Sequence, residues 1–328
     1  MTFFVLGSTL LGMAITWPAD AKDPSYEPTV LAAVQAGQFE VSFTPIQNSW
    51  NGHSATFYVT TDAVKIDGFR PGMGARLMQQ VADLLGCTLL TGRLSDLAYA
   101  QAAVKLTPIT LGMMGGLTTN DMMKISTMRK ESQMLDAALA KANYAGGLVF
   151  GPAKPWLIDN QLPKYPGKAE NYGQYVPQAP GTNWLGVSVA STVSKLPNVG
   201  VIQGYWWPPF HTLDQNDYSE MAWLFHRYCI VDGQPRDTLD VMVDPELCGL
   251  MTHDGKPLTV GRQPGVAPYG CTPVNSKVGP MCPMPTMPVG AEPVEGLTIA
   301  QKVLLGIGGL VLAFGTFELV KHLRWLRG

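Results

Sequence analysis

The chain has 328 residues, a formal net charge of −2 at pH 7, and only 15% charged residues. This composition excludes nucleic acid as an expected partner, because phosphate binding depends on clustered Lys and Arg side chains. The five cysteines form no Cys-x-x-Cys pair, which argues against a zinc site and against a thioredoxin-type redox site. We therefore expect no metal and no other cofactor.

An apolar segment opens the chain. Residues 3–17 form an apolar core, and Ala19-Asp20-Ala21 offers the small-x-small pattern of a signal-peptidase site just before Lys22. The amino terminus is the only positive charge ahead of this core. These features predict a signal peptide over residues 1–21. An uncleaved membrane anchor and an ordinary buried segment are the alternatives.

Residues 22–258 have the periodicities of a globular extracytoplasmic body. Amphipathic helices are predicted over residues 28–36, 72–85, 94–104 and 120–142. Strands are predicted over residues 39–45, 55–60, 148–150, 186–190, 200–206 and 224–231. One or two helical turns are expected within residues 239–250. The predicted fold class is α+β (mixed α/β), with a helix-rich N-terminal half packed with a strand-rich second half.

The C-terminal region predicts a stalk, a membrane helix and a tail. Residues 259–296 are rich in Pro and Gly without apolar periodicity, which is typical of a semi-extended stalk. Residues 297–320 are apolar except near their ends, and a run of roughly 20 such residues crosses a bilayer. Lys and Arg in the basic tail, residues 321–328, favour the cytoplasmic side, so we expect a single-pass membrane protein. A buried core helix is the alternative. Gly309 and Ala313, four residues apart, would allow self-association through the membrane helix.

The cysteines allow two disulfide pairs outside the cytoplasm. Cys271 with Cys282 would close a short loop in the Pro-rich stretch, and Cys229 with Cys248 is a second candidate pair. This pairing leaves Cys87 free. The alternative is that Cys87 and Cys229 are small buried apolar residues.

The densest group of reactive side chains lies between residues 205 and 226. His211, Asp217 and Glu220 are the candidate catalytic residues, because an imidazole and two carboxylates can form a general acid and base pair or a partial metal site. A structural interpretation stands beside this one. The three-residue spacing of Asp217 and Glu220 is that of a capping box, in which each side chain bonds to a backbone N–H near the other residue.

Aromatic residues flank this group. Trp206, Trp207 and Tyr218 are the candidate substrate-binding residues, since aromatic rings can stack on a sugar or line a pocket. Plain packing in a core or loop is the alternative for the two tryptophans. His53 and His253 lie beside Gly-containing turns and are expected at the surface. The sequence does not show which carboxylates would converge across a sugar, as a glycosidase needs; the candidates are Asp96, Glu131, Asp214, Asp217 and Glu220.

Several stretches resemble a group of uncharacterised exported bacterial and phage-encoded proteins. They are residues 56–59 (Thr-Phe-Tyr-Val), 82–91, 104–108, 217–219 (Asp-Tyr-Ser), 231–233 and 244–247. In that group the Asp-Tyr-Ser motif continues with His-Gly, whereas this chain has Glu220 and Met221. Pro208 or Pro209 stands near the position of a further histidine of the group. The resemblance implies common descent and export, and the loss of any chemistry that those histidines perform.

Two functions of different class are compatible with the sequence. The first is a membrane-tethered extracytoplasmic hydrolase that acts on a cell-wall or surface polymer. The alternative is a non-catalytic envelope or phage-encoded structural or binding membrane protein. In both cases the expected partners are membrane lipid around residues 297–320 and a further copy of the membrane helix. The hydrolase adds the cell-wall polymer as its substrate.

Overall fold

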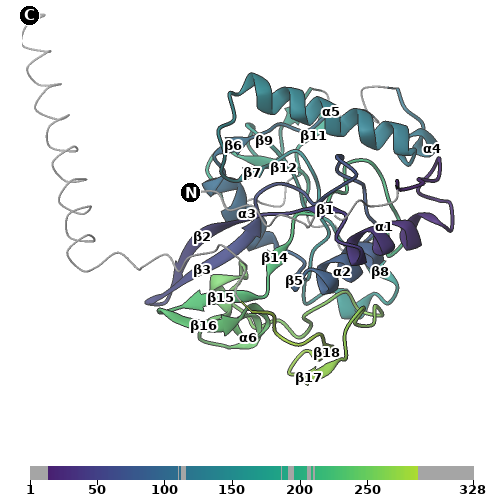
Figure 1. Cartoon of the computed structure of the whole chain (residues 1–328). Coiled ribbons are helices and arrows are strands. Elements are labelled where there is room, and N and C mark those ends of the chain that lie inside the picture. Colours follow the sequence, from purple (N-terminus) through teal and green to yellow (C-terminus); the bar gives the residue numbers. More distant parts are fainter. Residues whose placement is uncertain are drawn as a thin grey trace, which may run out of the picture. The chain divides into compact units, whose positions relative to one another are not determined.

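The computed structural model describes residues 14–109, 111, 116–185, 187–190, 196–204, 208–209 and 211–286 (Figure 1). The chain divides into two compact units, residues 1–291 and 292–328, and every described residue belongs to the first. This unit has a mixed α/β fold, as the sequence predicts. The predicted membrane helix 297–320, the tail 321–328, residues 287–296 and residues 1–13 lie outside the described residues. In the described part of the chain, no helix is long and apolar enough to cross a membrane.

The largest sheet in the described residues is antiparallel and has six strands. Its strand order is β16-β15-β3-β14-β5, and β2 pairs with β3 as well. The strands are β2 (Phe43–Trp50), β3 (His53–Thr60), β5 (Cys87–Thr88), β14 (Phe225–His226), β15 (Tyr228–Val231) and β16 (Gln234–Asp237). Asn51 and Gly52 have positive φ angles of 49° and 83° and make the tight turn between β2 and β3. This hairpin is the pair of strands expected early in the chain, and it contributes strands to the sheet centre from the helix-rich half.

Smaller two-stranded pairs surround this sheet. The antiparallel pairs are β1 (Phe39–Glu40) with β4 (Lys65–Ile66), β8 (Lys168–Ala169) with β13 (His211–Thr212), β9 (Gly173–Val176) with β12 (Gly200–Gln203), β10 (Asn183–Trp184) with β11 (Val187–Ser188), and β17 (Val274–Ser276) with β18 (Gly279–Met281). The pair of β6 (Val104–Lys105) with β7 (Val149–Phe150) is parallel.

Most helices come from the first half of the chain, as expected. They are α1 (Tyr26–Gln35), α2 (Ala75–Leu84), α3 (Gly92–Gln101), α4 (Thr119–Met122), α5 (Ile125–Lys141) and α6 (Thr238–Val243), with 3-10 turns η1 (Leu162–Lys164) and η2 (Cys248–Leu250). The single helix expected over residues 120–142 is interrupted, because Lys124 takes an extended conformation with ψ 137° and pairs with Asp20. Figure 1 shows α5 lying along one side of the unit, away from the β17–β18 hairpin.

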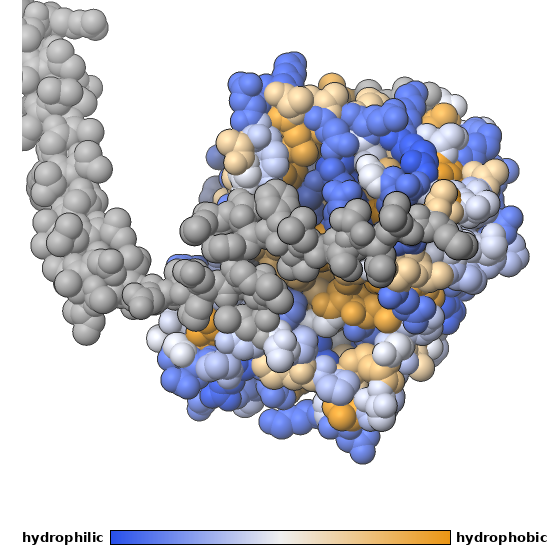
Figure 2. All heavy atoms as spheres, viewed as in Figure 1, coloured by the Kyte–Doolittle hydropathy of each residue, from blue (hydrophilic) through white to orange (hydrophobic). Residues whose placement is uncertain are grey.

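One large core links these elements. The apolar face of α2, with Leu77 and Val81, is fully buried against it. The largest fully buried side chains include Trp156 and Trp223. Their indole N–H groups donate to the carbonyl oxygens of Met73 (2.7 Å) and Val149 (2.9 Å), so neither polar group is left unsatisfied. At the surface, hydrophilic and hydrophobic residues are interspersed over the face seen in Figure 2.

Residues 259–286, here named the C-terminal arm, pack on the body. Arg262 donates to Asp83 of α2 (2.7 Å) and to the Val266 carbonyl oxygen (2.7 Å), and Gln263 donates to the Leu157 carbonyl oxygen (2.6 Å). The semi-extended stalk expected from residue 259 onward is therefore not seen as far as residue 286. Single polar side chains attach the arm to the body. Because such side chains leave no apolar periodicity in the sequence, this packing could not be predicted from the pattern.

The predicted disulfide between Cys271 and Cys282 is formed within this arm. The second candidate pair is not formed, since Cys229 and Cys248 are free and buried. Cys87 is also free and buried, as expected. Burial raises the pKa of Cys229 to about 12, so this thiol stays protonated and behaves as a small apolar side chain.

Candidate functional site

The structure brings two predicted catalytic carboxylates together on a lysine that the sequence did not single out. Lys154 Nζ lies 2.9 Å from Asp217 Oδ2 and 3.4 Å from Glu220 Oε1. Lys154 follows β7, whereas Asp217 and Glu220 belong to the connection between β13 and β14. Glu220 has no exposed surface, and the side chains of Lys154 and Asp217 are 11% and 13% exposed. We name these three residues the buried ion cluster.

Local hydrogen bonds hold the two carboxylates. Asp217 Oδ1 accepts from the N–H and the hydroxyl of Ser219, both at 2.7 Å, and Glu220 Oε2 accepts from the Asp217 N–H at 3.0 Å. The bond from Glu220 back to the Asp217 N–H is the one that the capping-box interpretation predicts, whereas Asp217 bonds Ser219 and the motif lies in a turn and not at a helix start. The turn lies against Gly72, where a Cβ atom would stand 2.1 Å from the Asp217 carbonyl oxygen.

The buried ion cluster carries one negative carboxylate. Burial opposes the ionisation of Asp217, but the charge of Lys154 and the bonds from Ser219 outweigh it and lower the pKa of Asp217. Burial, together with the charge of Asp217, raises the pKa of Glu220 well above its ordinary value. The same two causes raise the pKa of Glu131 on α5. Asp217 and Lys154 are therefore the ion pair, with two neutral acids beside them.

The other predicted site residues are placed as follows. His211 on β13 is 3% exposed, its ring meets Trp156 edge-on at 5.4 Å, and burial lowers its pKa. Tyr218 is 4% exposed, and its N–H donates to the Met122 carbonyl oxygen (3.1 Å). Trp206 and Trp207 lie outside the described residues. The four described candidates converge on one region, but none of them presents its reactive atoms on an open surface.

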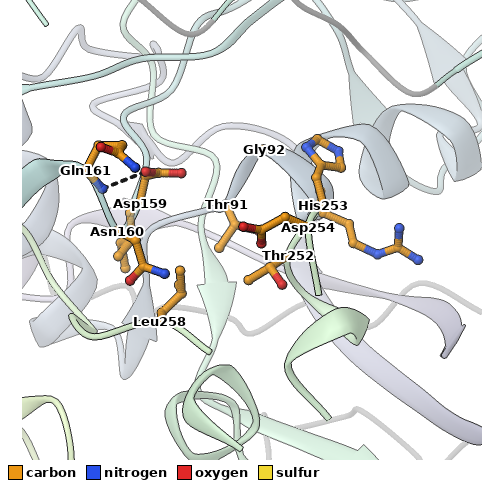
Figure 3. A pocket seen from close by; sticks show the side chains of 11 residues that line it. Thr91, Gly92, Asp159, Asn160, Gln161, Thr252, His253, Asp254 and Leu258 are labelled. Atoms are coloured by element: carbon orange, nitrogen blue, oxygen red, sulfur yellow. Dashed lines mark hydrogen bonds between the residues drawn. The ribbon is translucent and has the colours of Figure 1, made fainter. Parts of the chain in front are cut away.

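A pocket of about 320 Å³ lies elsewhere, between the start of α3, the loop before η1 and the segment after η2 (Figure 3). It is lined by Thr91, Gly92, Arg93, Ile158, Asp159, Asn160, Gln161, Thr252, His253, Asp254 and Leu258. In Figure 3, Asp159, Asn160 and Gln161 form one wall, and Thr91, Thr252 and Asp254 form the opposite one. The volume is within the range of small-ligand sites, and the lining is rich in hydrogen-bonding groups.

Two carboxylates in this pocket have different environments. Burial is the main cause that raises the pKa of Asp159. The hydrogen bond that Asp159 accepts from the Gln161 N–H (2.8 Å) opposes this effect, and the negative charge of Asp254 adds to it. Asp254 is 58% exposed and lies 3.6 Å from Lys256 Nζ. The pocket thus combines a buried acid with a solvated carboxylate.

A buried hydrogen-bond network holds the side chain of His253, which lines the pocket. His253 Nε2 lies 3.1 Å from Asp96 Oδ2, and the two side chains are 14% and 6% exposed. Asp96 Oδ1 accepts from the hydroxyl groups of Tyr172 (3.0 Å) and Tyr175 (2.7 Å). Because an ionised carboxylate only accepts hydrogen bonds, Nε2 carries the hydrogen in this pair. The network therefore sets both the orientation and the tautomer of His253.

The pocket walls are held by bonds that cross between segments. Asn160 Oδ1 accepts from the Thr259 N–H (2.7 Å), and its Nδ2 donates to the Pro257 carbonyl oxygen (2.8 Å). Thr91 caps α3 by accepting from the Leu94 N–H (3.2 Å). These bonds keep the lining in one arrangement before any ligand binds, which lowers the cost of binding.

Few residues of this pocket can be recognised from the sequence. Asp96 is among the carboxylates that the sequence offers as candidates for convergence, whereas Asp159 is not. His253 was expected at the surface, but the structure pairs it with Asp96 across a separation of 157 residues. Nothing local in the sequence indicates such a contact. In the described residues, no group of three or more His, Cys, Asp or Glu side chains is placed to hold a metal.

No protein-family model, curated protein or solved structure matches the chain. The pocket and the buried ion cluster are therefore interpreted from their own geometry.

Proposed function

We propose that this protein is a membrane-tethered extracytoplasmic hydrolase of a cell-wall or surface glycan, with its reaction centre in the pocket at the start of α3. The apolar run 297–320, followed by the basic tail, supports the tether and its orientation. The observation that supports hydrolysis is the pairing of a buried acid, Asp159, with the solvated carboxylate of Asp254 in one pocket. A carboxyl group with a perturbed pKa in a pocket is a marker of functional sites.

Glycoside hydrolysis needs a proton donor and a second carboxylate on the other side of the bond. Asp159 is suited to donate, because its raised pKa keeps it protonated to higher pH. It gives its proton to the leaving oxygen as the glycosidic C–O bond breaks. Asp254 takes a proton from the attacking water, whose oxygen forms the new bond to the sugar carbon.

His253 acts as a positioning residue in this scheme. Asp96 and the two tyrosines hold its ring at the pocket, where its protonated form lowers the pKa of Asp159. Thr91, Thr252 and the wall residues provide hydrogen-bonding groups for sugar hydroxyls.

The test uses the full-length protein in detergent micelles with purified peptidoglycan or surface glycan as substrate. Asp159→Asn and Asp254→Asn should each lower the release of soluble fragments by about 10²-fold or more, the effect of losing a general acid or base. Asp214→Asn is the control, because Asp214 is 62% exposed and pairs with Arg76. Equal release by both pocket variants and the wild type would reject the assigned roles.

A non-catalytic binding protein is the second candidate. It is favoured by the buried ion cluster, in which the carboxylates expected to be catalytic are held by Lys154 and by local backbone bonds. The two candidates differ in the same assay. Retention of glycan by the wild type without release of fragments, and loss of retention in Asp254→Asn, would favour binding over hydrolysis.

A further inference from the structure

Residues 15–21, here named the N-terminal segment, lie on the folded body although they belong to the predicted signal peptide. Ile15, Trp17 and Ala21 pack against the main core. The Trp17 ring meets Phe69 edge-on at 4.9 Å, and its N–H donates to Asp67 Oδ2 at 3.0 Å. A half-buried aromatic ring with a satisfied N–H is typical of a permanent structural contact.

Phe69 and Asp67 are shared with a second partner, Arg129 of α5. The Arg129 guanidinium lies 4.2 Å from the centre of the Phe69 ring and 2.7 Å from Asp67 Oδ2. Trp17 and Arg129 therefore both contact the Phe69 ring and both donate to Asp67 Oδ2. Removal of Trp17 would expose Phe69 and take one hydrogen bond from Asp67.

The backbone of the N-terminal segment also completes the start of α5. The Ile125 N–H donates to the Ala19 carbonyl oxygen (3.1 Å), and the Ala21 N–H donates to the Met123 carbonyl oxygen (2.9 Å). The N-cap residue of α5, Lys124, makes no side-chain cap bond. The first N–H groups of a helix lack intrahelical partners, so Ala19 supplies an acceptor that the helix does not provide itself.

We infer that the bond after Ala21 is not the maturation site, and that residues 15–21 are a permanent part of the protein. A cut after Ala21 would remove Trp17 and the Ala19 carbonyl together. Gly12-Met13-Ala14 repeats the small-x-small pattern upstream, and apolar residues precede it. A cut after Ala14 would leave Ile15 as the first residue and keep every contact of the N-terminal segment. This inference goes beyond the proposed function and does not depend on the pocket.

The first test is the amino terminus of the protein isolated from membranes, read by intact mass and by its N-terminal peptide. We expect the chain to begin at Ile15 or upstream of it. A chain that begins at Lys22 overturns the inference. Ala19→Arg blocks a cut after Ala21 but changes only an exposed side chain, so it should leave the processing unchanged. Loss of processing in this variant would also overturn the inference.

The second test is thermal unfolding of the full chain. Its result can be interpreted whether or not a leader is removed. Trp17→Ala should lower the unfolding temperature by roughly 4–8 °C, the shift expected when a domain of this size loses a partly buried aromatic ring. Thr16→Ala is the matched control, because the neighbouring Thr16 is exposed and should leave the temperature unchanged. Equal unfolding temperatures for both variants would show that the N-terminal segment contributes nothing to the fold.

Discussion

Glu131 is a buried acid without a hydrogen-bond partner among the described residues. It has no exposed surface, and neither carboxyl oxygen is bonded. Burial, together with the charge of Asp217, raises its pKa well above the ordinary value. In the unfolded chain a glutamate ionises near a pKa of about 4.3. Folding therefore takes up a proton above that pH, and Glu131 lowers stability progressively as the pH rises toward its folded-state pKa.

Glu131→Gln should change this pH dependence. Glutamine does not titrate, so the stability of the variant relative to the wild type should increase as the pH rises above about 5, by up to roughly 1.4 kcal/mol per pH unit. Urea unfolding at several pH values measures the difference. Glu246→Gln, at an exposed position, is the control and should show no such trend. A difference that stays constant with pH would mean that Glu131 titrates alike in both states.

Lys154→Met removes the cation of the buried ion cluster. Asp217 would then remain buried without its partner, and breaking one side of a buried ion pair costs about 3–5 kcal/mol. Urea unfolding should show a loss of this size, whereas Lys130→Met, at an exposed position on α5, should be nearly neutral. A loss below about 1 kcal/mol would place the pair in the range of surface salt bridges and reopen a catalytic role for Asp217.

Contacts between these residues can be predicted from the sequence only where the two partners are a few positions apart in the chain. Asp217 and Glu220 are three residues apart, so the bond from Glu220 back to the Asp217 N–H could be predicted from spacing alone. Lys154 meets Asp217 across 63 residues, and no local pattern marks a lysine that the fold will bury. The same holds for His253 and Asp96. The fold decides which distant side chains meet. The sequence shows only which residue types are able to form an ion pair or a hydrogen bond.

At the scale of elements, apolar periodicity predicts that a helix or strand forms, but it does not predict where that element is interrupted. The helix predicted over residues 72–85 corresponds to α2, which spans Ala75–Leu84. The strand expected over residues 224–231 is divided into β14 and β15 at Arg227. Arg227 turns its side chain toward Asp237 and the Cys282 carbonyl oxygen, and its N–H donates to the Gly86 carbonyl oxygen (3.0 Å). Such breaks come from contacts between distant segments, which periodicity does not contain.

The β17–β18 hairpin is an element held by its disulfide. Cys271→Ser with Cys282→Ser opens the loop between two cysteines whose sequence separation is 11, and closing a loop of about this length contributes about 2–3 kcal/mol in the chain-entropy model. We expect faster amide hydrogen exchange over the hairpin and a lower unfolding temperature. Reductant should produce the same change in the wild type and none in the double variant. An unchanged exchange rate would show that the arm contacts alone hold the hairpin.

At the scale of the whole molecule, the Pro- and Gly-rich composition predicts that the body ends at residue 258, but residues 259–286 pack on it. The C-terminal arm is rich in Pro and Gly, yet Arg262 is 7% exposed and binds Asp83 through both terminal nitrogens of its guanidinium (3.3 and 2.7 Å). Tyr269 adds a bond from its N–H to the same carboxylate (3.0 Å). One buried aspartate on α2 thus fixes two points of the arm. The described part of the body therefore extends to residue 286.

Trypsin can locate this boundary in the native protein. The bond after Arg262 should resist cleavage in the folded full-length protein, since its side chain is buried, and should be cut after unfolding in urea. Lys277 is exposed in the turn between β17 and β18 and reports that the protease is active. Because this turn lies inside the Cys271–Cys282 loop, fragments cut at Lys277 stay joined until reductant is added. Rapid cleavage at Arg262 of the folded protein would instead support an extended stalk from residue 259, with the arm detached from α2.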